Sequence, residues 1–239
     1  MDWLPDFAIS HDDLPPAIEN ITDYRKLVET AAERIYKTEK SEHRGEIGEL
    51  LLHAICRQFS GTFPAVSKIY YKDSSNDVVK GFDLVHTRMN EATEELELWL
   101  GEAKFYRSGR EAVADAIQSI RKHLKAGFLT SEKILVGAKI SRDAPGYTQL
   151  EWLFDRDTAL DEIFQRLVIP ILIAYDSTKT ANYQDDSTYD AALINEFASF
   201  QKALSQRLPS NISMHCFYFP MDSKQTLIRS FDKKLGGFS

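Results

Sequence analysis

Glu102 and Lys104 are the side chains whose types and spacing most clearly suit chemistry. They lie in the run Leu96-Glu97-Leu98-Trp99-Leu100-Gly101-Glu102-Ala103-Lys104-Phe105. Alternate residues of a β-strand share a face, so the two charges extend a row of three leucines that faces a core. Charged groups on a buried face need partners or a metal ion. The stretch therefore predicts a charged site at the end of a core-facing strand.

The strand expected before it carries a second carboxylate in Gly81-Phe82-Asp83. If the two strands pair through a short loop, Asp83 lies beside Glu102, and two such carboxylates repel unless a proton or cation sits between them. Mg²⁺ suits two carboxylates, a backbone carbonyl and waters, and Mn²⁺ substitutes for it; Ala103 would offer the carbonyl. Such an ion lowers the pKa of an attacking water. Lys104 would add positive charge where charge develops on a phosphate.

An upstream helix carries two glutamates, Glu46 and Glu49, which share a helix face with His53. Either could reach the metal ion from the side, and we favour Glu49 because it directly precedes the apolar pair Leu50-Leu51. The alternative is that Glu42, Glu46, Glu49, His53 and Arg57 form one solvated polar arc. The poor helix formers Gly45 and Gly48 suggest close approach of this helix to the sheet or to DNA.

On the helix after Lys104, three polar side chains are expected to touch phosphate or a base: Gln118, Arg121 and Lys122. Ser108 is expected to cap the start of this helix. The plain alternative for the whole pattern is an edge strand on which Glu102 and Lys104 form a surface ion pair.

The elements that position these residues follow from periodicity and turn signals. The expected helices are Ile21–Glu39, Glu42–Phe59, Ser108–Ala126, Asp155–Leu167, Asp190–Leu208 and Asp222–Leu235. The expected strands are Val66–Lys72, Gly81–Arg88, Glu95–Phe105, Lys133–Ile140, Val168–Tyr175 and Ser213–Phe219, the first three as an antiparallel meander. This order predicts an α/β fold, a mixed central sheet flanked by helices on both faces. Residues 1–20 are expected to be an extended arm, residues 21–239 a single domain, and Asp176–Tyr189 a polar loop.

The composition narrows the class of protein. Of 239 residues, 43% are hydrophobic and 27% charged, as in an ordinary globular protein. There is no membrane-length apolar run and no signal-peptide pattern, and the two cysteines, Cys56 and Cys216, suit a reduced compartment, so we expect a cytoplasmic protein. The net charge of −7 argues against a free-standing DNA binder, although a basic groove can sit on an acidic protein.

A helix glutamate, then an Asp on one strand and Glu-x-Lys on the next, resembles the PD-(D/E)XK nuclease superfamily over Glu42 to about Lys122. Phe82-Asp83 stands where the superfamily has Pro-Asp, and Gln118 falls where some members carry a glutamine. The runs Arg44–Glu49, Gly81–Asp83 and Trp99–Tyr106 are also similar to the nuclease subunit (HamA) of the Hachiman anti-phage system. The resemblance implies a restriction-endonuclease-like core, Mg²⁺-dependent DNA cleavage and a superfamily 2 helicase as partner.

Two functions are therefore compared. The first is a nuclease effector that cuts DNA within a helicase–nuclease defence complex. The second is a non-catalytic nucleic-acid-binding or scaffold subunit with a decayed nuclease fold. Because the chain is acidic, we expect weak binding to DNA by the chain alone and delivery of DNA by the helicase. Candidate contacts for that partner are Trp3, Leu4 and Pro5 of the arm, and the later half of the chain.

Overall fold

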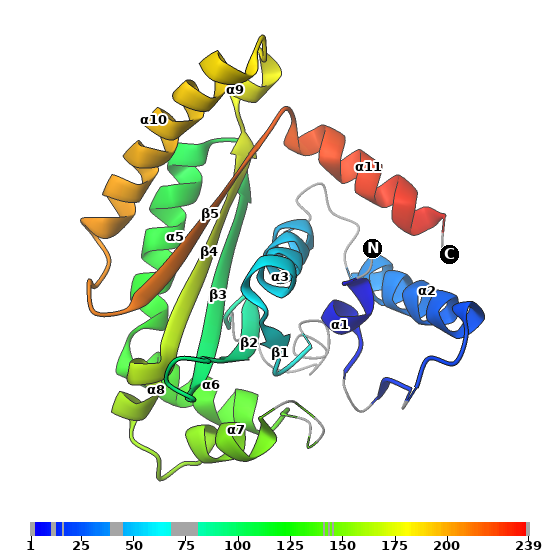
Figure 1. Ribbon diagram of the computed structural model, residues 1–239, viewed down its shortest axis with the longest axis vertical. Helices are drawn as coiled ribbons and strands as arrows, with labels where there is room; N and C mark the ends of the chain where they lie inside the picture. The colour runs from blue at the N-terminus through cyan, green and yellow to red at the C-terminus, as the bar shows by residue number, and fades with distance from the viewer. Residues whose placement is uncertain are drawn as a thin grey trace.

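The computed structural model describes residues 3–10, 13–15, 17–38, 45–67, 81–140, 142, 144 and 146–237. Within them, strands form one sheet in the order β1-β2-β3-β4-β5 (Figure 1). They are β1 (Phe63–Pro64), β2 (Leu84–Met89), β3 (Leu96–Tyr106), β4 (Leu167–Asp176) and β5 (Ser213–Met221). β1, β2 and β3 pair antiparallel, and β3, β4 and β5 pair parallel. The expected mixed sheet is confirmed.

Helices cover both faces of this sheet (Figure 1). They are α1 (Leu4–Ala8), α2 (Ile21–Thr38), α3 (Glu46–Ser60), α5 (Gly109–His123), α6 (Ala126–Gly137), α7 (Tyr147–Phe154), α8 (Leu160–Arg166), α9 (Thr178–Ala181), α10 (Asp186–Ser205) and α11 (Lys224–Gly236). On one face α3 packs against the sheet, with α1, α2 and α11 farther out. On the other face lie α5 and α10. No described helix has both the length and the apolar character needed to cross a membrane.

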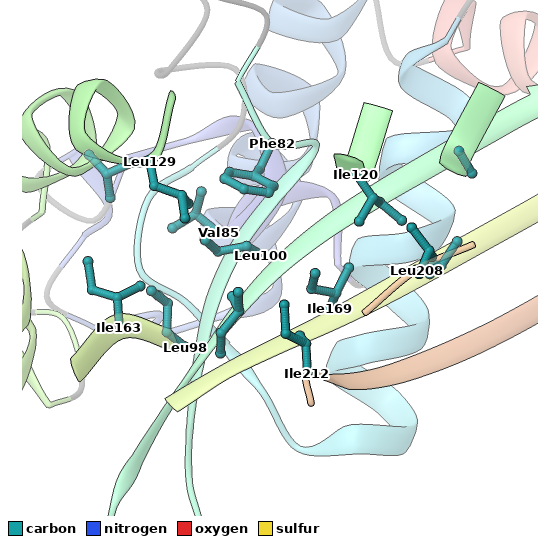
Figure 2. Close-up of a cluster of buried hydrophobic side chains, with 14 of the residues drawn as sticks. Phe82, Val85, Leu98, Leu100, Ile120, Leu129, Ile163, Ile169, Leu208 and Ile212 are labelled. Carbon is teal, nitrogen blue, oxygen red and sulfur yellow. The ribbon is translucent and has the colours of Figure 1, made fainter. Parts of the chain in front are cut away.

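The side chains of β3 alternate between two separate apolar cores, as the row of leucines predicted. Leu96, Leu98 and Leu100 belong to the core under α5, together with Ile117 and Ile120 of that helix. Figure 2 shows Leu98 and Leu100 in this layer, beside Phe82 and Val85. Trp99 and Phe105 point the other way, into the core under α3. Glu102 and Lys104 continue the leucine row, so they lie on the α5 face of the sheet.

Two glycines let α3 approach β3 closely. A Cβ added to Gly101 would lie 2.8 Å from Leu52 Cδ2 and 2.9 Å from Leu84 Cβ. A Cβ on Gly48 would lie 3.0 Å from Phe105 Cβ. Gly48 faces Phe105 and Leu52 faces Gly101, so α3 runs antiparallel to β3. The N-terminus of α3 therefore lies near the C-terminal end of β3, just beyond Lys104. The expected role of Gly48 in close packing is confirmed.

The strand expected over Lys133–Ile140 is wrong, since most of this segment belongs to α6 and no described strand covers the rest. A short apolar run does not distinguish a buried helix segment from a strand. The helical period appears only when the partners are known: Leu129, Lys133 and Val136 are buried, whereas Ile134 is about half exposed at 48%. Helices α6, α7 and α8 together fill the segment between α5 and β4.

Other differences are smaller. The helix expected over Asp155–Leu167 begins only at Leu160, and the expected loop Asp176–Tyr189 contains α9 and the first residues of α10. Of the strand expected over Val66–Lys72, residues 66 and 67 are not extended, and residues 68–72 lie outside the described residues. Cys56 and Cys216 are both free thiols.

The extended arm expected at the N-terminus is wrong for Leu4–Ala8, which form α1. Leu4 and Phe7 are each only 1% exposed and pack against α2. Arg57 of α3 holds this segment by an ion pair with Asp6, 3.1 Å between Nε and Oδ2. The helix was not predicted because the apolar residues of α1 stand among prolines and aspartates and show no steady period in the sequence. Since Leu4 and Pro5 are buried within the chain, they do not offer the partner contact that we expected.

Candidate active site

The pairing of β2 with β3 brings Asp83 to Glu102. Leu84 is opposite Gly101 in the antiparallel register, and Asp83 stands one residue before Leu84. The Asp83 amide donates to the carbonyl of Gly101 at 2.9 Å. Its carboxylate oxygen Oδ2 accepts a hydrogen bond from the Ala103 amide, also at 2.9 Å. The two carboxyl groups and the Ala103 backbone therefore gather at one end of the β2–β3 pair, as the sequence predicted.

Glu102 is buried and only 4% exposed. Its Oε1 lies 2.8 Å from Lys104 Nζ, and its Oε2 lies 3.3 Å from Nδ1 of His123 on α5. Burial and the nearby charge of Asp83 raise the pKa of Glu102 to about 7, against the opposing effects of Lys104 and Ser119. This carboxyl group therefore changes protonation near neutral pH. Its ionised form is stabilised by a positive charge, which the Lys104 ammonium supplies here.

Lys104 is held by acceptors from two directions. Besides Glu102, its Nζ lies 2.7 Å from Asp115 Oδ2 and donates to Ser119 Oγ at 3.1 Å. Burial by itself would lower the pKa of Lys104, but the charges of Glu102 and Asp115 outweigh it and raise the pKa above its ordinary value. The ammonium is consequently charged throughout the physiological range. The surface ion pair on an edge strand, considered as the plain alternative, is wrong, because β3 lies inside the sheet, Glu102 is buried and the Lys104 side chain is only 12% exposed.

Four residues of this site were not found from the sequence: Tyr106, Asp115, Ser119 and His123. The last three are spaced four apart on α5, so they form one row on the side of the helix that faces β3. Tyr106 OH donates to Asp115 Oδ2 at 2.6 Å. The i, i+4, i+8 spacing of these polar residues could have indicated a polar row on one side of the helix. Assigning that row to the site required knowing which face of α5 meets Lys104.

An aromatic pair encloses the imidazole of His123. The ring of Phe82 meets it edge-on at 4.7 Å, and the ring of Phe128 stacks on it at 4.5 Å between centroids. Phe82 directly precedes Asp83, so the same backbone turn that presents the carboxylate also packs against His123. The Phe-Asp in place of Pro-Asp thus has a packing role here.

The three residues expected to contact nucleic acid are all exposed on α5. Lys122 follows Asp115 by seven residues, so it lies on the side of the helix that borders the site, and Gln118 flanks it. Arg121 is turned away from that side by the helical repeat. Their contact with nucleic acid stays a prediction.

The glutamates Glu46 and Glu49 belong to α3, the helix that covers the face of the sheet opposite Glu102. Glu46 is buried and Glu49 half-buried, and His53 is buried too. The solvated polar arc considered as an alternative is therefore wrong for Glu46 and His53; Glu42 lies outside the described residues. Burial, together with the charge of Arg57, lowers the pKa of His53 to about 3, and its Nδ1 lies 3.0 Å from His86 Nε2.

Among the residues that the structure describes, no three His, Cys, Asp or Glu side chains are grouped so that they could hold one metal ion. Glu46 and Glu49 are accordingly not gathered with Asp83 and Glu102 into one ligand set. Asp83, Glu102 and the Ala103 carbonyl remain the oxygen donors with the chemistry that Mg²⁺ prefers.

A mixed sheet that places Asp at the start of one strand and Glu-x-Lys in the next is consistent with a PD-(D/E)XK-like core. The family model of HamA matches residues 1–235, nearly the whole chain. The chain belongs to the HamA family, which confirms the resemblance to a component of the Hachiman anti-phage defence system. A search of curated proteins finds no match.

Proposed function

We propose that this chain is a metal-dependent nuclease that cleaves DNA phosphodiester bonds within the Hachiman defence system. The observation that carries the proposal is the opposition of Asp83 and Glu102 across β2 and β3, with the Lys104 ammonium 2.8 Å from Glu102. A purely structural ion pair would need only one carboxylate. Here burial and the second carboxylate, Asp83, together raise the pKa of Glu102 to about 7, an arrangement that a divalent cation would relieve.

Asp83, Glu102 and the carbonyl of Ala103 would hold the ion, with Mg²⁺ or Mn²⁺ as the natural choices for oxygen ligands. When bound, the ion lowers the pKa of a water molecule and offsets charge on the phosphate. Lys104 places a fixed positive charge beside the same phosphate, where it stabilises the charge that develops during attack. Lys122, on the bordering side of α5, would contact the flanking phosphate backbone.

The test is cleavage of plasmid DNA by Asp83→Ala, Glu102→Ala and Lys104→Ala proteins, with Glu111→Ala, at an exposed residue in the first turn of α5, as a control. We expect the unsubstituted and Glu111→Ala proteins to cut with Mg²⁺ or Mn²⁺ and to fail with Ca²⁺, whose looser shell positions water poorly. The three site variants should not cut. Each protein is checked by circular dichroism for folding. Cleavage by folded Glu102→Ala or Lys104→Ala at the unsubstituted rate would contradict the assignment.

We also propose that the partner is the superfamily 2 helicase of the same defence system. The chain carries a net charge of −7, so long-range repulsion slows its encounter with DNA and favours delivery by a second protein. The later half offers apolar contact surface: Trp152 of α7 is 48% exposed and Ile194 of α10 is 66% exposed.

Co-expression with a superfamily 2 helicase encoded beside this chain tests this partner. The two chains should co-purify, and the isolated chain should bind duplex DNA only weakly at physiological salt. Trp152→Ala and Ile194→Ala should weaken the complex without changing the folding of the free chain. Tight, salt-resistant DNA binding by the chain alone, with no complex on co-expression, would refute the proposal.

A further inference from the structure

The Lys104 ammonium contacts residues besides Glu102, the only proposed metal ligand within reach of it in the contacts described. Glu102 supplies one acceptor, and α5 supplies two more, Asp115 Oδ2 at 2.7 Å and Ser119 Oγ at 3.1 Å. An ammonium has three donors, and here each has an acceptor. Asp115 and Ser119 are one helical turn apart, so they contact Lys104 from the same side of α5.

Asp115 is itself fixed in place. Tyr106, two residues after Lys104 on the same strand face, donates its hydroxyl to the same oxygen of Asp115 at 2.6 Å. The carboxylate therefore receives both the tyrosine hydroxyl and the lysine ammonium. Tyr106, Asp115, Lys104 and Glu102 form a continuous chain of short contacts between β3 and α5.

This chain matters because a lysine side chain is a point charge on four flexible methylenes. If Glu102 were its only partner, the ammonium would lose that contact whenever the Glu102 carboxylate bound a cation. Asp115 is not among the oxygen donors assigned to the cation, so its hold on Lys104 does not compete with that cation. Such a second anchor keeps the charge aimed at the reacting phosphate, and positioned charges contribute far more than mobile ones.

We propose that Asp115 is a positioning residue for Lys104, with Tyr106 fixing the orientation of the Asp115 carboxylate. The role rests on the nuclease activity proposed above. Asp115 touches neither substrate nor cation in this role. It acts only through the lysine ammonium, so its loss should slow the chemical step more than it weakens DNA binding.

The first measurement is steady-state cleavage by Asp115→Asn, which keeps the shape of the side chain and removes its charge. We expect kcat to fall by about 10- to 100-fold, as for other residues that orient a catalytic group, with KM changed by less than about threefold. Tyr106→Phe should lower kcat in the same direction by a smaller factor. The matched control is Glu111→Gln, which removes one negative charge one helical turn before Asp115 on α5, and it should cleave normally.

The second measurement does not depend on cleavage. Urea unfolding of Lys104→Met, Asp115→Asn and the double variant forms a cycle that reports whether the two side chains interact. We expect non-additive effects, because each substitution removes the same contact. Additive effects would overturn the proposal, as would an Asp115→Asn protein that cleaves at the unsubstituted rate. No cleavage by the unsubstituted chain with any metal ion or with its helicase would overturn both the proposed function and this role. Normal cleavage by Asp115→Asn alone would overturn only the role.

Discussion

Raising the pH of the metal-free protein through neutrality should remove a proton from Glu102 and destabilise the fold. Burial and the charge of Asp83 raise the pKa of this carboxyl group from 4.5 to about 7. In the unfolded chain the group ionises near its ordinary value. Folding therefore favours the protonated form. The stability that Glu102 contributes is fully present below about pH 4.5 and is lost as the pH rises through about 7.

The size of this effect follows from the difference between the folded and unfolded pKa. That difference is about 2.5, from 4.5 to about 7, and each pKa unit is worth about 1.4 kcal/mol. The loss is therefore about 3 kcal/mol between pH 4.5 and pH 8. For a domain of this size, such a loss is a large fraction of the total stability.

Urea unfolding at a series of pH values, followed by circular dichroism in EDTA, measures this effect. Glu102→Gln cannot ionise, so the free energy of unfolding of the unsubstituted protein minus that of Glu102→Gln isolates the one group. This difference should fall by about 3 kcal/mol as the pH rises from 4.5 to 8. Adding Mg²⁺ at pH 8 should restore stability to the unsubstituted protein only, since a ligand stabilises the state that binds it. A difference that stays constant with pH would refute the electrostatic argument.

Three further outcomes are expected. Gly101→Ala should lower the free energy of unfolding by about 1 to 3 kcal/mol through overpacking against α3, whereas Gly127→Ala, with open space around it, should not lower it. Ser108→Ala should cost about 1 kcal/mol in the same urea assay, because Ser108 Oγ accepts from the Glu111 amide at the start of α5; an unchanged midpoint would contradict this. In cleavage assays, Glu46→Ala and Glu49→Ala should both cut at near-normal rates, because neither glutamate is grouped with Asp83 and Glu102; a loss of cleavage by folded Glu49→Ala alone would contradict this and support the role first expected for Glu49.

The features that the sequence predicted correctly depend on the backbone geometry of a single helix or strand, or of two strands joined by a short connection. The alternation in β3 predicted the core-facing row, and with it the burial of Glu102 and the position of Lys104 on the same face. Ser108 was identified as a cap from local chemistry, and its side chain does accept from the Glu111 amide. Asp83 needed only a short connection between neighbouring strands. Each of these follows from backbone geometry within a few residues.

The parts that sequence missed depend on how separate elements dock. Asp115 and His123 matter because α5 lies antiparallel along β3, and no local pattern gives that rotation. The helix α6 was taken for a strand because its apolar run is short and because its packing partners, chiefly α7 and α8, come later in the chain. The α1 segment was taken for an extended arm because its burial depends on α2 and on Arg57.

The position of β3 inside the sheet limits how this protein can be restrained. Glu102 and Lys104 lie opposite Ile171 and Ile173 of β4, both fully buried, and on the other side the ladder between β2 and β3 ends at Gly101, just before them. Strands paired within a buried core belong to the parts of a domain that open least readily. Under the proposed function, a regulator that displaced the Glu-x-Lys stretch would have to break its pairing with β4. A regulator that acted by occlusion would instead cover the α5 side of the proposed site and leave β3 in place.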